Sequence, residues 1–365
     1  APLGAARTLA HLRASPVALG VSLRRMARII AYEPEDMTVV AEAGLTLGAL
    51  NDHMAARRQH LPLDPPDPPS ITLGALIGAA KSGPLRLMEG TPRDLLIGIR
   101  FAGHGGRIVH GGGAVVKNVA GYDLMKVLTG SFGTLGIIIE ATFKVRPLPE
   151  RCTIARIECD KVDDAFSLAA RIHDALALVH LDVVSPATAK SAGLTGGDHF
   201  VIAAGICGNR REIDYQIEKI AHLAGAAKLE ILQLATALRS YRRLRDIQFP
   251  TPGIEALIAT APAALPRCVE ACGGEFHAHA GSGIARLFAP GEIAACDARD
   301  LINRWRESAR AARGHLRILA APPALRGMLD IFDAPTPAAL KLMTRLKQTF
   351  DPAGIFNPGC FVGGL

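Results

Sequence analysis

Two histidines lie two residues apart in the segment FHAHAGSG, at His277 and His279. If this segment is a β-strand, both side chains face the same side, because side chains alternate along a strand. Imidazole groups in that arrangement can act as a catalytic base or bind a metal ion. The sequence identifies no third metal ligand, so we predict no metal site and keep a purely structural strand as the alternative to catalysis.

Glycine clusters mark a second region with chemical potential, the stretch from Gly111 to Val145, GGGAVVKNVAGYDLMKVLTGSFGTLGIIIEATFKV. Glycine carries no Cβ and adopts positive φ, so a glycine loop lets a bulky ligand approach the backbone. Consecutive backbone N–H groups in such a loop can also bind an anion. The stretch therefore predicts a nucleotide-cofactor site, with a tight turn before a core strand as the alternative.

Small residues dominate the segment from Ser70 to Asp94, SITLGALIGAAKSGPLRLMEGTPRD. A helix that begins with so little side-chain bulk lets a large ligand lie against its backbone, and helix N-termini favour phosphate groups. The alternative is a small-residue helix that packs closely on another element. The preceding loop, LPLDPPDPPS at 61–70, is predicted to be extended and rigid, because proline disfavours helix there.

Length and composition describe a globular protein. The 365 residues are enough for two domains, since single cores stop growing at about 250–300 residues. The chain is 49% apolar and 21% charged, as is usual for such proteins. Its net charge of +7 is combined with only 5% aromatic residues. We therefore predict solvated basic helix faces and no nucleic-acid partner, with an acidic partner or a membrane surface as the alternative.

Membrane and disulfide signatures are both missing from the sequence. No apolar run approaches the ~20 residues of a transmembrane helix, and the first residues lack the apolar stretch of a signal peptide. The seven cysteines are scattered and include no C-x-x-C pair, which argues against a disulfide framework or a cysteine-ligated iron–sulfur cluster. We expect reduced, mostly structural cysteines in a cytoplasmic protein.

The elements that must position these residues follow an α+β pattern. A strand over 35–44 precedes a helix capped by Thr46, and residues 95–112 are predicted to form a β-hairpin. Between residues 151 and 235 the order is β-α-β-β-α-β, which is that of a ferredoxin-like unit. A C-terminal helix then leads into DPAGIFNPG, whose paired proline–glycine turns predict a segment that docks elsewhere.

Four motifs occur along the chain in the order found in a known family: TLGALIGAAKSGP, TPRDLLIG, VVKNVAGYDLMKVLTGSFGTLGIIIEATFKV and DPAGIFNPG. With them the chain resembles the FAD-linked oxidases of the vanillyl-alcohol-oxidase (PCMH) type. Within that superfamily, VVKNVAGYDL is most similar to the FAD-binding E-subunit family of bacterial glycolate oxidases. The likeness covers nearly the whole chain and is strongest over 38–150 and 337–365. It implies an α+β fold, with a PCMH-type two-subdomain FAD-binding domain and a ferredoxin-like α+β cap domain.

The resemblance also implies a domain division. An FAD-binding PCMH-type domain is expected over 1–150, a cap or substrate domain over 151–331, and a C-terminal segment over 332–365 that returns to the FAD domain. The pyrophosphate loop corresponds to Gly4–Thr8, without its preceding strand, so we expect the first domain to be truncated at its N-terminus. FAD is expected to bind non-covalently, because no His or Cys stands at a position of covalent attachment.

Further FAD contacts implied by the resemblance come from the proline loop, the small-residue segment, the second glycine loop and the tail. They are Pro65, Pro66, Thr72, Leu73, Gly74, Gly78, Ser82, Gly83, Gly133, Thr134, Gly136, Ile137, Ile138 and Asn357. The sequence departs from the family at Ala75, where a second glycine is usual, and at Phe132, where Glu or Tyr is common. Leu85 and Leu87 replace residues that are often Arg and Pro.

Catalytic residues are less defined. FHAHAGSG is similar to the H-x-G-D-G segment of the catalytic D-type subunits, but Ser282 occupies the Asp position. His277 and His279 therefore remain candidates for catalysis beside a structural role. Arg86 and Arg93 can hold a substrate carboxylate or the FAD phosphates, with surface or structural roles as the alternative.

The leading hypothesis from the resemblance is an FAD-binding subunit of a glycolate (2-hydroxy acid) oxidase or dehydrogenase complex, an oxidoreductase acting on CH–OH groups. Its partners would be a homologous FAD-containing catalytic subunit and an iron–sulfur subunit that receives the electrons. The complex is expected in the cytoplasm, free or peripheral at the inner membrane through partners. The alternatives are a self-sufficient FAD-dependent D-2-hydroxy acid dehydrogenase of the D-lactate type, and a flavin-poor structural subunit that supports a catalytic homologue.

Overall fold

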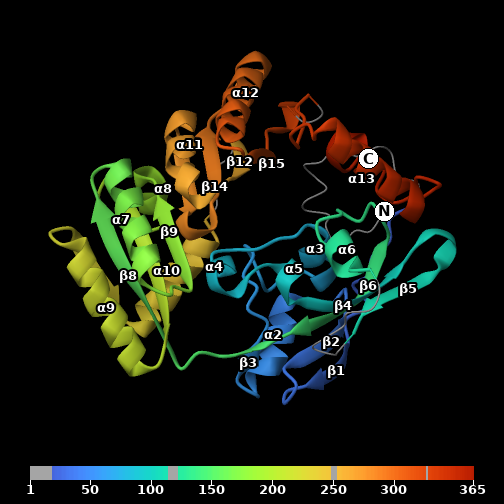
Figure 1. Cartoon of the computed structure of the whole chain (residues 1–365), viewed down its shortest axis with the longest axis horizontal. Coiled ribbons are helices and arrows are strands. Elements are labelled where there is room, and N and C mark those ends of the chain that lie inside the picture. Colours follow the sequence, from blue (N-terminus) through green and yellow to red (C-terminus); the bar gives the residue numbers. More distant parts are fainter. Residues whose placement is uncertain (1–18, 114–121, 248–252, 326–327) are drawn as a thin grey trace. The chain divides into compact units, whose positions relative to one another are not determined.

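A computed structural model describes residues 19–113, 122–247, 253–325 and 328–365 of the chain (Figure 1). The described residues form two compact units. Unit 1 comprises the residues up to Gly83 together with Gly90–Leu148 and Ala334–Leu365, and unit 2 comprises Pro84–Glu89 and Pro149–Asp333. Each unit is therefore assembled from segments that are separated along the chain.

Unit 1 is built on an antiparallel sheet with the strand order β1-β2-β6-β4-β5. These strands are β1 (Ile29–Glu33), β2 (Thr38–Glu42), β6 (Ile137–Lys144), β4 (Leu96–Ala102) and β5 (Ile108–Gly112). The predicted hairpin over 95–112 is confirmed by the pairing of β4 with β5. A separate two-stranded pair joins β3 (Gln59–His60) to β7 (Arg146–Pro147).

The described part of unit 1 also contains helices. They are α2 (Leu47–Ala55), α3 (Leu73–Gly78), α5 (Pro92–Leu95), α6 (Leu124–Leu128) and α13 (Pro337–Phe350), with the 3-10 turns η2 (His104–Gly106) and η6 (Val362–Gly364). The helix predicted to follow Thr46 is confirmed, because Thr46 Oγ1 accepts the Ala49 N–H at 3.2 Å. Leu47, Leu50 and Met54 of α2 lie on one face and join the buried core of the unit.

The tail after α13 is bonded to the turn before β6. The ammonium group of Lys347 donates to the carbonyl oxygens of Thr134 and Phe356, each at 2.8 Å, and to the Asp351 carboxylate at 2.6 Å. Asn357 Nδ2 donates to the carbonyl oxygen of Phe132 at 2.7 Å, across a sequence separation of 225. The tail is thus an integral part of unit 1.

Unit 2 contains an antiparallel sheet with the order β11-β8-β10-β9-β13-β14-β12-β15. In chain order the strands are β8 (Arg151–Cys159), β9 (His180–Val184), β10 (Phe200–Gly208), β11 (Lys228–Leu232), β12 (Gly253–Ala259), β13 (Glu275–His279), β14 (Ile284–Pro290) and β15 (His315–Ala320). The predicted β-α-β-β-α-β order is present over β8 to β11, with one additional short helix, α8 (Pro186–Ser191), between β9 and β10. The sheet order 4-1-3-2 within this half is that of a ferredoxin-like unit. The second half, β12 to β15, repeats the same sheet order without an α-helix in the described residues between its second and third strands, and it joins the first half through β9 and β13.

Helices lie on both faces of this sheet. They are α4 (Arg86–Glu89), α7 (Val162–Ala175), α8 (Pro186–Ser191), α9 (Arg210–Ala224), α10 (Leu234–Arg245), α11 (Leu265–Cys272) and α12 (Ala295–Ala311), with the 3-10 turns η3 (Pro262–Ala264), η4 (Ala280–Ser282) and η5 (Pro323–Leu325). The buried faces of α7, α9, α11 and α12 form the larger core, and α8 and α10 form a smaller one with other residues of the sheet. Since strand side chains alternate, each strand contributes to both faces.

One sequence expectation is wrong in unit 2. Cys152 and Cys207 form a disulfide, whereas we expected reduced cysteines. The two residues are 55 positions apart in the chain but lie directly opposite each other where β8 pairs with β10. Local cysteine spacing carries no trace of such a cross-strand pairing. The other five cysteines are free.

Candidate functional site

Unit 1 contains a cavity of about 920 Å³. Its lining comes from residues 22–27, 43–49, 66–81 and 132–138 and from Asn357. A volume near the upper end of the ~300–1,000 Å³ that is common for ligand sites suits a large cofactor rather than a small metabolite. All of these segments belong to the same unit.

Close backbone packing shapes one wall of the cavity. The Gly74 N–H donates to the carbonyl oxygen of Ala43 at 2.8 Å, and a Cβ on Gly74 would lie only 3.2 Å from that oxygen. Thr72 caps α3 by accepting the Ala75 N–H at 3.3 Å. At the other end of α3, Gly78 faces open space, with no atom within 4 Å of the position of a Cβ. A ligand can therefore approach the backbone of α3 directly.

The turn before β6 supplies another part of the lining. Phe132, Gly133 and Gly136 all have positive φ, at 53°, 70° and 155°. A Cβ on Gly136 would come within 2.8 Å of the Phe101 ring, so glycine is needed there. Asn357 lines the cavity, is 1% exposed, and its Oδ1 has no hydrogen-bond partner among the described residues. A ligand N–H or O–H can satisfy this buried acceptor, whose isolation costs about 1–3 kcal/mol.

Charged side chains also reach the cavity. Arg24 and Lys81 are cationic, and Asp67 is the one acidic residue among the lining side chains. Two cations beside exposed backbone suit the phosphates of a dinucleotide. The volume of the cavity, its small residues, the unsatisfied acceptor on Asn357 and the cationic side chains together fit FAD. These residues would hold FAD without a covalent bond.

The structure brings together eight of the fourteen residues that the sequence predicted as cofactor contacts. These are Pro66, Thr72, Gly74, Gly78, Gly133, Gly136, Ile138 and Asn357. The other six predicted residues do not line the cavity. They are Pro65, Leu73, Ser82, Gly83, Thr134 and Ile137. Leu73 is fully buried in the core, Thr134 donates its hydroxyl to the Ser131 carbonyl oxygen, and a Cβ on Gly83 would collide with the Asp64 backbone.

Other predicted residues lie elsewhere. Gly4–Thr8 and most of the KNVAGYD motif fall outside the described residues, although Asp123 is described and caps α6 through the Lys126 N–H at 3.1 Å. Arg86 lies in α4 of unit 2 and Arg93 in α5 of unit 1, and neither lines the cavity.

The sequence missed the lining residues from 22–27 and from 43–49. The available signal was Gly44, since a Cβ there would lie 1.9 Å from the Leu23 carbonyl oxygen and glycine is required for the two segments to meet.

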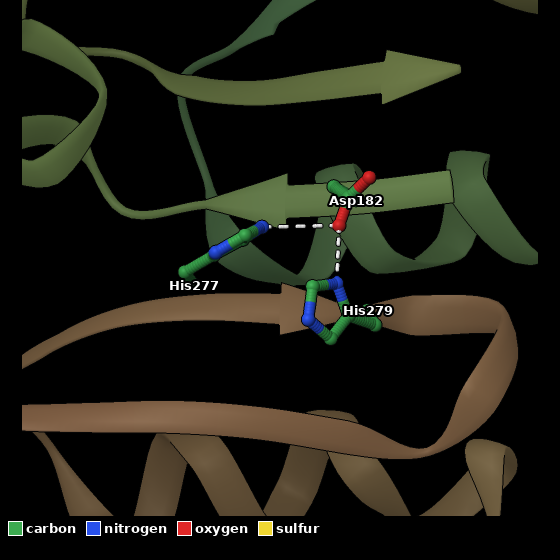
Figure 2. A group of neighbouring side chains, drawn as sticks. All are labelled: Asp182, His277 and His279. Carbon is green, nitrogen blue, oxygen red and sulfur yellow. Dashed lines mark hydrogen bonds and ion pairs between the residues drawn. The ribbon is translucent and has the colours of Figure 1, made fainter. Parts of the chain in front are cut away.

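Unit 2 holds a second group of chemically capable side chains. His277 and His279 of β13 both point toward Asp182 of β9 (Figure 2). His277 Nε2 lies 3.0 Å and His279 Nδ1 2.6 Å from the same carboxylate oxygen, Oδ1. His180 Nδ1 lies 2.8 Å from the other oxygen, Oδ2. The prediction that the two β13 histidines share one face is confirmed, and Asp182 is a candidate ligand that the sequence did not reveal.

Burial and hydrogen bonding set the charges in this cluster. Burial by itself raises the pKa of Asp182, which is fully buried, but hydrogen bonds from three histidines hold that pKa well below its usual range. Burial lowers the pKa of His277 to about 4, against the opposing effect of Asp182. At neutral pH the cluster thus contains an ionised carboxylate and a neutral His277. His277 Nδ1 has no hydrogen-bond partner among the described residues.

Comparison with known proteins gives two family matches. Residues 1–112 match the family described as "FAD binding domain", and residues 333–360 match "FAD linked oxidases, C-terminal domain". Among the solved structures, alkyldihydroxyacetonephosphate synthase has a TM-score of 0.68 at 18% identity, covering 94% of this chain and 69% of that one. This likeness concerns the fold, and it confirms the predicted α+β, PCMH-type class.

Curated relatives include glycolate oxidase and D-lactate dehydrogenase proteins. Glycolate oxidase subunit GlcE of Escherichia coli (strain K12) is 34% identical over 131 residues, 36% of this chain and 37% of that protein. Glycolate oxidase subunit GlcD of Bacillus subtilis (strain 168) is 37% identical over 131 residues, 35% of this chain and 27% of that protein. A D-lactate dehydrogenase of Archaeoglobus fulgidus is 25% identical over 92% of this chain and 80% of its own length. The chain thus aligns with about a third of each glycolate oxidase subunit.

Proposed function

Since the chain carries an FAD binding domain and the C-terminal segment of an FAD-linked oxidase, we propose that it takes part in the oxidation of a 2-hydroxy acid by FAD. The observation that carries this proposal is the cavity of unit 1. Residues from the first family match and Asn357 from the second line the same cavity, so both matched segments contribute to one cofactor site.

The substrate class comes from the relatives. Their names refer to glycolate, D-lactate and D-2-hydroxyglutarate, which all carry a hydroxyl group on the carbon next to a carboxylate. Bound FAD would supply the two-electron oxidant for this CH–OH group. The residues of this chain would hold and orient the cofactor: α3 and the turn at 132–138 through their backbone, Asn357 through its amide, and Arg24 and Lys81 through their charges.

We further propose that the chain works as a subunit of a complex. Two features support this: the similarity to glycolate oxidase subunits, and a cysteine pattern without the ligands of an iron–sulfur cluster. In this proposal a homologous FAD-containing subunit and an iron–sulfur subunit are the partners, and the iron–sulfur subunit receives the electrons. The complex would work in the cytoplasm or at the inner membrane, to which its partners would attach it. Among the described residues, no helix has the length and apolar character needed to cross a bilayer.

Two alternatives have a specific observation in their favour. The alignment with the D-lactate dehydrogenase of Archaeoglobus fulgidus over 92% of this chain favours a self-sufficient dehydrogenase. Ala75 lines the cavity with a methyl group where the family usually has glycine, which favours a flavin-poor structural subunit.

The visible absorption spectrum of the chain, purified without partners, separates the three. We expect a yellow protein that stays oxidised when glycolate or D-lactate is added anaerobically and is bleached once the partner subunits are present. Bleaching without partners would contradict the proposal of a complex subunit and support a self-sufficient dehydrogenase. A chain that remains colourless after incubation with FAD and removal of the excess would contradict FAD binding and leave the structural role.

A further inference from the structure

We propose that Asp182, His277 and His279 form a binding site for a divalent transition-metal ion of the zinc or iron(II) class. One ligand atom from each residue is available, and these three atoms all lie within 4.8 Å of one another. The site is distinct from the FAD cavity, because its residues belong to unit 2 and none of them lines that cavity.

The distances fit a common ion. Asp182 Oδ1 is 3.0 Å from His277 Nε2 and 2.6 Å from His279 Nδ1. Ligand atoms bonded to zinc at about 2.0–2.1 Å in tetrahedral geometry lie roughly 3.3 Å apart. Each histidine nitrogen therefore has to move away from the carboxylate oxygen by less than about 1 Å to receive an ion.

The ring protons of His277 and His279 do not prevent metal binding, because each can lie on the nitrogen that does not face the ion. A metal needs a lone pair on His277 Nε2 and on His279 Nδ1, the nitrogens that now approach the carboxylate. A ring that carries one proton frees that nitrogen by holding the proton on its other nitrogen. His277 Nδ1 has no hydrogen-bond partner among the described residues, so the shift breaks no hydrogen bond at that atom.

Neighbouring residues already hold the proposed ligands in position. His180 donates to Asp182 Oδ2, which leaves Oδ1 for the ion and fixes the plane of the carboxylate. Gly205 makes room for His180, because a Cβ there would lie 2.1 Å from the imidazole. His279 and Asp182 are direct partners in the β13–β9 ladder, so the sheet itself holds two of the ligands in register. Ligands on rigid paired strands are preorganised for binding.

A cation lies beside the site, and its charge helps to lower the pKa of His277. Arg286 is the cross-strand partner of His277 on β14. Its guanidinium donates to the Glu255 carboxylate at 2.7 Å and to the Ile247 carbonyl oxygen at 2.9 Å, so a paired carboxylate offsets part of its charge.

The ligand set indicates the class of metal. Two imidazoles and one carboxylate are the donors of catalytic zinc sites and of iron(II) sites with open positions, whereas magnesium and calcium prefer oxygen alone. Three protein ligands leave coordination positions for water or another small ligand. Metal binding here does not depend on the proposed flavin function, and it can be tested whether or not the chain oxidises a hydroxy acid.

The test uses the full chain after treatment with a chelator. Addition of Co²⁺ should produce a visible absorption spectrum of a four- or five-coordinate ion that saturates at one ion per chain and disappears when Zn²⁺ displaces it. Zn²⁺ should also raise the thermal unfolding temperature, since an ion that binds only the folded state stabilises that state.

Variants assign the ion to these residues. Asp182→Asn and His279→Ala should each weaken Zn²⁺ binding by more than ~100-fold, since even a residue that only hydrogen-bonds to a metal ligand is worth about 10- to 100-fold. His199→Ala is the matched control: His199 also pairs with an aspartate, Asp160 at 3.0 Å, but at the surface. It should leave the affinity unchanged.

Two results would overturn the site. One is a wild-type chain that shows neither the Co²⁺ spectrum nor a Zn²⁺-dependent rise in unfolding temperature. The other is unchanged affinity in a variant that circular dichroism shows to be folded. If both variants fail to fold, His180→Gln, which removes only the supporting donor, should weaken Zn²⁺ binding by about 10- to 100-fold, and unchanged affinity there would also overturn the site.

Discussion

The cavity of unit 1, which we propose as the FAD site, and the histidine cluster of unit 2 are built in opposite ways. The cavity depends on missing side chains: Gly74 and Gly136 avoid contact with Ala43 and the Phe101 ring, and Gly78 borders open space. The cluster is formed by side chains on two paired strands, and its geometry depends on one buried carboxylate. The cavity should therefore be sensitive to added atoms, and the cluster to removed ones.

The largest expected effect is the loss of the Asp182 carboxylate. In the metal-free chain, Asp182→Ala should lower the free energy of unfolding by about 3–5 kcal/mol, because it leaves three buried histidines without their acceptor. Chemical denaturation monitored by circular dichroism measures this. Asp160→Ala, which removes the acceptor of the exposed His199, should change stability by less than ~0.5 kcal/mol. Equal losses in the two variants would show that the cluster adds nothing beyond a surface pair.

Filling the cavity should have the next largest effect. Gly78→Leu places a side chain in the open space beside α3, so FAD affinity should fall by more than ~100-fold while the chain remains folded. Flavin fluorescence during titration of the cofactor-free chain measures the affinity. Gly196→Leu is the matched control, because Gly196 also faces open space but lies outside the cavity, in unit 2. Unchanged affinity in Gly78→Leu would place the flavin elsewhere.

Docking of the tail should respond to pH through Asp351. Burial raises the pKa of Asp351. Lys347 and the backbone N–H groups of Phe356 and Ile355 lower this pKa by a larger amount, so the net shift is downward. A lowered folded-state pKa stabilises the protein above the unfolded value of about 3.9 and loses this effect as pH falls through the folded value. Asp351→Asn should cost about 1–3 kcal/mol at pH 7.

The difference between wild type and Asp351→Asn should shrink as the pH falls from about 4 toward the folded-state pKa of Asp351. Urea unfolding at several pH values measures it. A difference that stays constant across this range would mean that the ionised carboxylate is not what holds the tail.

The smallest expected effect comes from Ala75. Ala75→Gly removes a methyl group from the cavity wall and should strengthen FAD binding by a few-fold. The same change should lower stability by at most about 1 kcal/mol, because glycine is a poor helix former and Ala75 lies in α3. Fluorescence titration and thermal unfolding measure the two effects. Weaker FAD binding in Ala75→Gly would mean that the methyl group contacts the cofactor productively.

Local patterns in the sequence predicted much of both regions. The Thr46 cap, the hairpin over 95–112 and the β-α-β-β-α-β order depend on neighbouring residues, and they are confirmed. The face shared by His277 and His279 follows from the period of a strand, and it too is confirmed.

The contacts that could not be predicted from the sequence depend on strand pairing between distant segments. Asp182 meets His277 across 95 residues, and Cys152 meets Cys207 across 55. Both contacts are set by the register of paired strands, which no local pattern specifies. The cavity wall at 22–27 was missed for a related reason, since Gly44 shows its role only when Leu23 lies against it.

The contact between Asn357 and Phe132 also has a consequence for protein synthesis. All of unit 2 after Pro149 is translated between these two residues. Unit 2 can therefore complete its sheet while the growing chain is still attached to the ribosome, and domains generally fold in that order. The wall of the cavity that contains Asn357 can close only after this residue has been translated, so the proposed cofactor site is completed later than the sheet of unit 2.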